Sequence, residues 1–140
     1  MFSPGQILDD RYEILALLAE GGMGTVYRAR RTLLGDEVAI KIVRGEHGAA
    51  GSRDRFFRES RASARLRHPY IVSILDFNVD DEDHPFLVME LLNGPSLKEE
   101  IATKGRMTIA EVQAIVPSLC TALQFAHDLG IVHRDLKPAN

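Results

Sequence analysis

The chain has 140 residues, of which 45% are hydrophobic and 26% are charged, and its formal net charge at pH 7 is −3. That length is enough to bury a core, and the composition is typical of a soluble globular domain. The slight acidic excess gives no reason to expect binding to nucleic acid or to a membrane surface. Arginines gather at 28–31 and 53–67, but acidic residues are interspersed among them, which favours a solvated surface.

No targeting signal is apparent. Residues 1–10 lack the basic, apolar and cleavage regions of a signal peptide, and no apolar run is expected to span a bilayer. The single Cys120 lies in an apolar helical pattern, which favours core packing in a reducing compartment over a catalytic thiol. We therefore expect a cytoplasmic location and no membrane segment within this chain.

The N-terminal part is rich in expected strands. Alternating apolar residues predict strands over 12–18, 25–32 and 37–43, joined by short turns. The first turn contains the glycine cluster at 21–24. Three consecutive strands with short connections predict an antiparallel meander.

A helix is expected over 53–67, ending at the proline of 68–69. Its core-facing side is predicted to include Glu59, because Glu59 lies at helical spacing from other members of that side. These other members are Phe56, Ser63 and Leu66. Apolar-rich runs at 71–79 and 86–92 then predict a hairpin.

Two capped helices are predicted to follow. Ser96 and Glu99 have the spacing of a capping box, and Thr108 and Glu111 repeat it. The second helix is expected to kink at Pro117 and to end at Gly130. Its predicted buried stripe is Val112, Ile115, Leu119, Ala122, Leu123 and Ala126.

Strands dominate the first part of the chain and helices the second, which predicts an α+β protein with two lobes rather than alternating βαβ units. We place the small lobe at residues 1–92 and the start of a helical large lobe at 93–140.

The glycine cluster in "AEGGMGTV" (19–26) is a candidate phosphate cover, since glycine lets backbone amides approach an anion closely. A tight hairpin would use the same residues. A dinucleotide-binding fold would need a helix after the glycines, whereas a strand is expected here. A Walker-type loop would need a Gly-Lys-Ser/Thr sequence, which is absent.

Lys41 lies in the middle of an apolar strand, on the same face as Ala39. A lysine that faces a protein interior is costly unless it is paired, although a lysine at a strand edge can extend to water. Glu59 is the candidate partner. An ion pair with Glu59 would hold the Lys41 ammonium where it can reach phosphate oxygens.

The run "HRDLKPAN" (133–140) carries the third candidate site. The Asp135 carboxylate can orient a substrate hydroxyl and accept its proton, and Lys137 can steady a transferring phosphoryl group. The side-chain carbonyl of Asn140 can hold Mg²⁺. Each residue alone is unremarkable, but their spacing and order after the other two motifs indicate phosphoryl transfer.

Together these motifs resemble the protein kinase superfamily, and the wording "GGMGTVYRAR" and "RHPYIV" is most similar to bacterial eukaryotic-type serine/threonine kinases. The resemblance implies catalytic roles for Lys41, Glu59, Asp135 and Lys137, and a metal-ligand role for Asn140. Met89 would be the gatekeeper, and Glu90 to Leu92 would form the hinge that meets adenine. The implied nucleotide-binding residues are Leu18, Ala19, Glu20, Gly21, Gly22, Met23, Gly24, Thr25, Val26, Ala39, Lys41, Met89, Glu90 and Leu92.

The resemblance thus implies a protein-kinase-like fold and an enzyme that transfers phosphoryl from Mg-ATP to a serine or threonine of a protein substrate. Lys137, two places after Asp135, is typical of the serine/threonine branch. There are two departures. Ala19 replaces the first glycine of the loop, and no DFG motif follows Asn140. We therefore expect a truncated catalytic domain that is inactive alone, with a non-catalytic nucleotide-binding or interaction fragment as the alternative.

Overall fold

The computed structural model describes residues 2–22, 24–43 and 52–139, and these form two compact units. The first unit comprises Met1–Arg65 and Val72–Leu92, and the second comprises Leu66–Ile71 and Asn93–Asn140. The second unit therefore includes residues 66–71 from the middle of the chain, and the lobe boundary after residue 92 stays a prediction.

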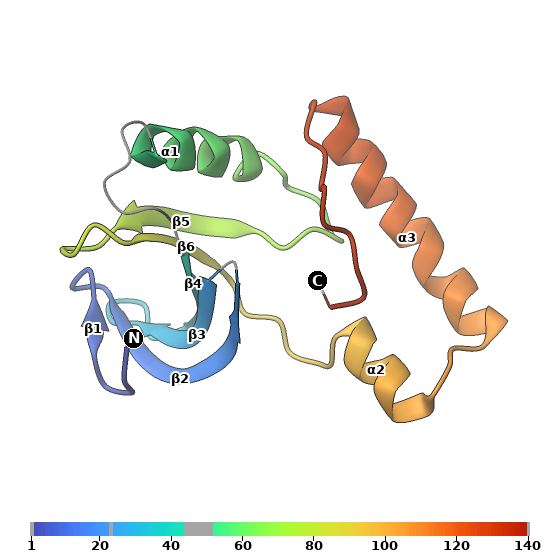
Figure 1. Ribbon diagram of the computed structural model, residues 1–140, viewed down its shortest axis with the longest axis horizontal. Coiled ribbons are helices and arrows are strands. Elements are labelled where there is room, and N and C mark those ends of the chain that lie inside the picture. Colours follow the sequence, from blue (N-terminus) through green and yellow to red (C-terminus); the bar gives the residue numbers. More distant parts are fainter. Residues whose placement is uncertain (1, 23, 44–51, 140) are drawn as a thin grey trace. The chain divides into compact units, whose positions relative to one another are not determined.

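The described residues of the first unit contain one antiparallel sheet with the strand order β1-β2-β3-β4-β6-β5 (Figure 1). Its strands are β1 (Ile7–Leu8), β2 (Tyr12–Gly21), β3 (Gly24–Arg31), β4 (Glu37–Val43), β5 (Ile74–Val79) and β6 (Pro85–Glu90). The predicted meander and the predicted hairpin are both confirmed. The sequence missed β1, because two residues are too few to show an alternating pattern.

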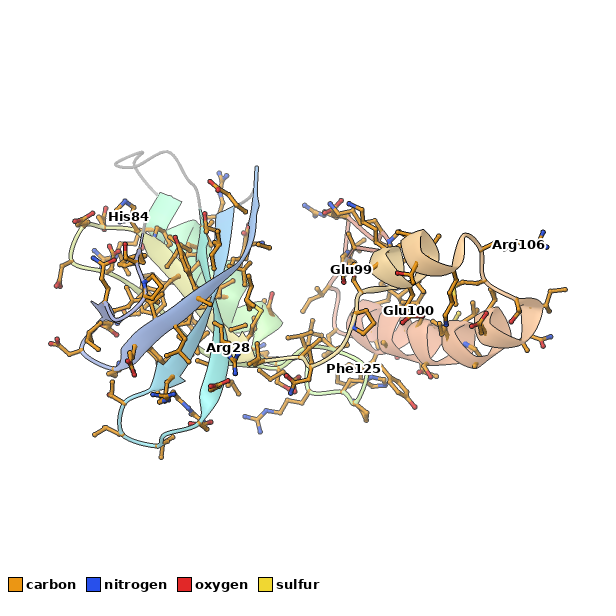
Figure 2. All side chains as sticks on the ribbon, turned by 90° about the horizontal axis from the view of Figure 1, so that it is seen from below. Arg28, His84, Glu99, Glu100, Arg106 and Phe125 are labelled. Atoms are coloured by element: carbon orange, nitrogen blue, oxygen red, sulfur yellow. The ribbon has the colours of Figure 1, made fainter. Side chains whose placement is uncertain are left out.

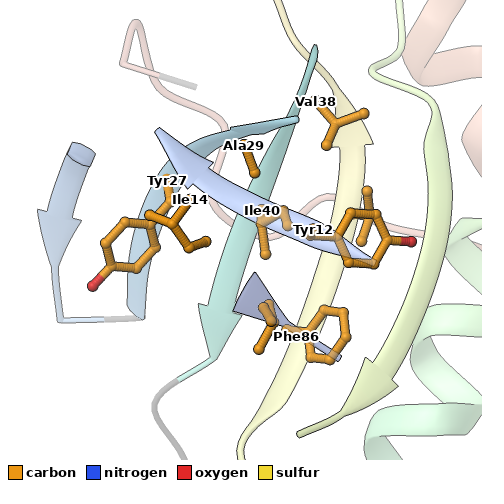
Figure 3. Close-up of a cluster of buried hydrophobic side chains, with 9 residues drawn as sticks. Tyr12, Ile14, Tyr27, Ala29, Val38, Ile40 and Phe86 are labelled. Carbon is orange, nitrogen blue, oxygen red and sulfur yellow. The ribbon is translucent and has the colours of Figure 1, made fainter. Parts of the chain in front are cut away.

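The core lies on one face of this sheet (Figure 3). Ile14, Val38, Ile40, Phe86 and Val88 have no exposed surface. Strands β2, β3, β4 and β6 each contribute two residues that alternate along the strand, as the pleat requires. The remaining buried members of this core cluster are Leu8, Tyr12, Tyr27 and Ala29.

Helix α1 (Ser52–Ser63) packs on β5 through aromatic side chains. The ring centroids of Phe56 and Phe57 lie 6.4 and 5.9 Å from that of Phe77, within the range of favourable aromatic pairs. Ser60, one turn further along the helix, is buried. The core-facing side of α1 is therefore set by Phe56, Phe57 and Ser60.

The second unit contains α2 (Leu97–Lys104) and α3 (Ile109–Asp128), and both predicted capping boxes are confirmed. Glu99, labelled on α2 in Figure 2, accepts from the Ser96 N–H at 2.7 Å. Glu111 accepts from the Thr108 N–H at 2.8 Å and from Lys104 Nζ at 3.0 Å. These hydrogen bonds favour the carboxylate and lower the pKa of Glu111 to about 2.

The predicted buried stripe of α3 is only partly correct. Ala122 and Ala126 are buried, and His68 stacks on Phe125 with centroids 5.4 Å apart. Val112, Ile115 and Leu119 are exposed, because no described element covers this half of the helix. Cys120, predicted to pack in a core, is exposed as well. The helix continues through Pro117 to Asp128, and the Gly130 N–H caps the His127 carbonyl.

By length and composition alone, α3 meets the requirements for a membrane-spanning helix, contrary to the expectation from the sequence. The same two properties are found in core helices of soluble domains, so they do not by themselves assign the helix to a bilayer.

Tyr12 links the core to the edge of the sheet and provides a test of this packing. Its hydroxyl donates to Asp76 Oδ2 at 2.8 Å, and Arg11 donates to the same oxygen at 2.7 Å. Burial, followed by the hydrogen bond to Asp76, raises the pKa of Tyr12 from 10.0 to about 12. The neutral phenol is therefore favoured in the folded state.

We expect Tyr12→Phe to lower the free energy of unfolding near neutral pH by about 1–2 kcal/mol, as for one lost hydrogen bond to a charged group. Because the folded-state pKa is raised, the tyrosine's contribution is complete below pH 10.0 and is lost as the pH rises through about 12. Urea unfolding of the unaltered chain and of Tyr12→Phe across this pH range should show the difference between their free energies of unfolding shrinking. A difference that stays constant up to pH 12 would contradict the assignment.

Candidate active site

Strand register brings five of the predicted nucleotide-binding residues to one face of the sheet. Val26 on β3 pairs with Lys41 on β4, and Lys41 pairs with Leu87 on β6. Directly paired residues project from the same face. Val38 and Ile40 belong to the core, so their neighbours Ala39 and Lys41 lie on the opposite face. We call this the nucleotide face, and its members are Ala19, Val26, Ala39, Lys41, Leu87 and Met89.

Three predicted residues lie on the core side of the sheet instead: Glu20, Thr25 and Glu90, which pairs with Val38. Thr25 pairs with Ile42, which packs against the core, and Thr25 itself is buried. Glu20 pairs with Thr25 and therefore lies on the same side. Their side chains are directed away from Lys41. Leu18, also predicted, is exposed at an irregularity in the pairing of β2 with β3.

The glycines of the first turn have different structural roles. A Cβ on Gly24 would lie 2.1 Å from the Ile42 carbonyl oxygen, and Gly24 has a φ of +139°. Only glycine therefore permits the close approach of β3 to β4. Gly21 and Gly22 have no neighbouring atoms within 4 Å of such a Cβ, so their backbone is open to a ligand. Met23 lies outside the described residues.

Lys41 is half-buried and makes no hydrogen bond or ion pair within the described part of the chain. Glu59 is exposed, so the prediction that it faces inward is wrong, and the expected ion pair with Lys41 is not formed in this structure. The reason is the rotation of α1, whose core-facing side is set by Phe56, Phe57 and Ser60. At 100° per residue, Glu59 falls beyond the edge of that side.

The segment predicted as a hinge begins at the end of β6. The Glu90 N–H donates to the Ser73 carbonyl at 3.1 Å, and the Glu90 carboxylate accepts from the Ser73 N–H at 2.6 Å. The Glu90 amide proton is therefore already engaged. Leu92, two residues further on, is exposed. Sequence reasoning missed Ser73, and nothing in its local sequence indicates this role.

The second unit positions the loop 133–139. Lys137 Nζ donates to Asp135 Oδ2 at 2.6 Å, and both side chains are about half exposed. The Asp135 N–H approaches His133 Nδ1 at 3.3 Å, and Arg134 has a left-handed φ of 62°. A non-glycine residue in that region is uncommon and is often found at functional sites. Asn140, the predicted metal ligand, lies outside the described residues.

Helix α2 fixes the end of this loop. The Lys98 N–H, in the first turn of α2, donates to the Pro138 carbonyl at 2.7 Å. The first N–H groups of a helix have no partner within the helix, so they require external acceptors. The sequence did indicate these donors, because the Ser96–Glu99 capping box marks the start of α2, where backbone N–H groups lack partners within the helix.

Each unit carries its own chemistry. The nucleotide face of the first unit presents an ammonium that has no partner among the described residues, and an open glycine backbone, which suit an anionic phosphate chain. The loop presents a carboxylate and a second ammonium side by side, which suit a hydroxyl and a transferring phosphoryl group. This combination on an α+β scaffold is typical of a phosphotransferase.

The comparisons with known proteins agree with this class. Residues 12–140 match the protein kinase domain, and the chain therefore belongs to the protein kinase family. It is 42% identical over 138 residues to a probable serine/threonine-protein kinase PknB of Corynebacterium glutamicum, covering 96% of this chain and 21% of that protein. It is also 42% identical over 140 residues to the DNA damage-responsive serine/threonine-protein kinase RqkA of Deinococcus radiodurans. That match covers 99% of this chain and 21% of RqkA.

Solved structures confirm the fold class. The kinase domain of Mycobacterium tuberculosis PknI superposes with a TM-score of 0.86 at 29% identity, covering 100% of this chain and 56% of that domain's chain. The predicted resemblance to bacterial serine/threonine kinases is thus confirmed. The chain spans about a fifth of the length of the curated relatives named above.

The glycines allow a matched test. Gly24→Ala should lower the free energy of unfolding by about 2–4 kcal/mol, because the added Cβ meets backbone at a left-handed φ. Gly22→Ala adds the same atom in open space and should change stability by no more than about 0.5 kcal/mol. Denaturant unfolding of the two variants measures both values. Equal losses would contradict the distinct roles assigned to these glycines.

Proposed function

We propose that these residues form the Mg-ATP-binding lobe and the catalytic loop of a serine/threonine protein kinase. The observation that carries the proposal is Lys41, a half-buried ammonium with no described partner on the face opposite the core. Burying a cation in this way is costly unless an anion meets it. The open glycine turn at the neighbouring strand ends makes a phosphate chain a suitable anion.

Each residue has a proposed role in transfer. Val26, Ala39 and Met89 contact the adenine side of the nucleotide, and the small Ala39 leaves room for the ring. Lys41 neutralises phosphate oxygens. Asp135 orients the attacking serine or threonine hydroxyl and accepts its proton, while Lys137 stabilises charge on the transferring γ-phosphoryl group. The Asp135–Lys137 contact at 2.6 Å keeps both groups within reach of one substrate atom.

The donor set also fits magnesium. Mg²⁺ prefers oxygen ligands and is commonly held by one or two protein oxygens together with substrate phosphates and water. The sequence provides one such oxygen in the side-chain amide of Asn140. When bound, the ion would neutralise charge that develops on the phosphates. The partner in catalysis is proposed to be a protein with an accessible serine or threonine, and the cytoplasmic location stays a prediction.

A second candidate function is nucleotide binding without turnover. It is favoured by the exposed Glu59, which leaves Lys41 without its predicted partner. In addition, these 140 residues contain no DFG sequence, the motif whose aspartate binds Mg²⁺ in protein kinases. We accordingly propose that a polypeptide of these residues alone binds Mg-ATP but does not transfer phosphoryl.

Lys41→Met should weaken binding of Mg-ATP about tenfold or more, because it removes a charge-assisted contact to phosphate. Adenosine, which has no phosphate, should bind within about twofold of its original affinity. Isothermal calorimetry with both ligands makes the comparison, and Lys98→Met on the exposed surface of α2 is the control. Equal losses for ATP and adenosine would overturn the assignment of Lys41.

Phosphotransfer should require both the loop and the rest of a large lobe. We expect no turnover of radiolabelled ATP by the 140-residue polypeptide, and measurable turnover by a chimera extended with the C-terminal half of a related kinase. Asp135→Asn should abolish the activity of the chimera, whereas the exposed Asp128→Asn should leave it within about twofold. Turnover that is unaffected by Asp135→Asn would refute the catalytic role.

A further inference from the structure

An open hollow of about 620 Å³ lies along α1 and the turn that follows it. Its lining includes three arginines, Arg58, Arg61 and Arg65. Arg58 and Arg61 lie on one face of α1, three residues apart, and Arg65 lies in the turn that follows the helix. The other lining residues are Asp54, Phe57 and Ala62. We refer to the three arginines as the arginine stripe.

The arginine stripe differs from most other described arginines of its unit, Arg55 being the exception. Five other arginines each form an ion pair with a carboxylate. These are Arg11, Arg28, Arg30, Arg31 and Arg53. Among the described residues, by contrast, the stripe arginines form no hydrogen bond or ion pair, and all three are exposed. The sequence predicted a solvated surface with interspersed acidic residues, but the fold directs Glu59 to a different side of the helix.

The hollow also has an apolar floor. Phe57 and Ala62 are half-buried, and the Phe57 ring is held in place by its contact with Phe77 and by Arg53, whose guanidinium lies 5.8 Å from the ring centroid. Asp54 is the one acidic residue in the lining. The surface therefore combines excess positive charge with a fixed apolar patch.

We propose that the arginine stripe binds a partner segment that carries phosphoserine or phosphothreonine. A phosphoryl group brings nearly two negative charges and three acceptor oxygens. Guanidinium groups match these oxygens in bidentate pairs, which an ammonium cannot form, and residues 53–67 contain arginines but no lysine. The apolar floor accepts a side chain next to the phosphorylated residue, which favours a peptide over a lipid headgroup. The proposal is independent of ATP binding and of catalysis.

The test is fluorescence anisotropy with a labelled peptide that carries phosphothreonine beside a leucine, and with the same peptide unphosphorylated. The phosphorylated form should bind at least about tenfold more tightly. Replacing all three stripe arginines (Arg58→Gln, Arg61→Gln and Arg65→Gln) should remove that preference. A control with the same change in charge, Arg30→Gln, Lys98→Gln and Arg106→Gln, should bind within about twofold of the unaltered chain.

A second variant separates geometry from charge. Arg58→Lys, Arg61→Lys and Arg65→Lys keep the positive charges but lose the bidentate contacts, so most of the preference should disappear. Full affinity in this variant would overturn the proposed recognition. The proposal would also be overturned if both peptides bound equally to the unaltered chain. It would likewise be overturned if the control variant lost the preference for the phosphopeptide as fully as the stripe variant.

Two further measurements complete the test. In the unaltered chain, NMR signals of the guanidinium N–H groups of the stripe should shift on addition of the phosphopeptide, a result that does not depend on the folding of any variant. Vesicles of phosphatidylglycerol serve as the alternative anion. Binding to vesicles through the stripe, without binding to the phosphopeptide, would overturn the proposal in favour of a membrane surface.

Discussion

Strand β4 is hydrogen-bonded on both edges, and its alternating side chains tie the candidate site to the hydrophobic core. Val38 and Ile40 have no exposed surface, and Ala39 and Lys41 lie on the opposite face. A slip of one residue would exchange the two faces and bring Lys41 into the core. Displacing Ile40 alone would cost about 2–5 kcal/mol on the scale of large-to-small core substitutions. The position of the Lys41 ammonium is therefore fixed by residues that never contact a ligand.

Two other structural features position the remaining parts of the candidate site. Gly24 allows β3 to approach β4 where any side chain would meet the Ile42 carbonyl, so the open backbone at Gly21 and Gly22 is held at the end of paired strands. In the second unit, the Lys98 N–H fixes the Pro138 carbonyl and thereby the end of the loop that carries Asp135. In both units, main-chain hydrogen bonding of regular elements positions the side chains proposed for phosphoryl transfer.

Local patterns were sufficient to predict most elements of the fold. The alternation in β2 to β4 and the capping boxes at Ser96 and Thr108 depend on short-range spacing, which the sequence displays directly. Strand β1 was missed because it is too short to alternate. The kinase motifs were identifiable because each joins a residue type to a fixed spacing.

Predictions failed where they depended on which neighbour covers a helix. Periodicity shows which residues share a face but not how far that face rotates toward a sheet, so Glu59 was wrongly placed inward. The same limit applies to α3, where only Ala122 and Ala126 of the predicted stripe are buried. It also hid the arginine stripe, since the sequence shows Glu59 nearby but not that Glu59 lies on another side of the helix.

Amide hydrogen exchange with bound ligands tests the central claim most directly, namely that the nucleotide face and its glycine turn hold the phosphates of ATP. Ligand binding slows exchange where backbone opening is suppressed or amides are engaged. Mg-ATP should slow exchange both at Gly21, Gly22 and Gly24 and at the Glu90–Leu92 segment, whereas adenosine should slow it at Glu90–Leu92 only. If Mg-ATP left the glycine amides unprotected, or if adenosine protected them equally, the claim would be contradicted.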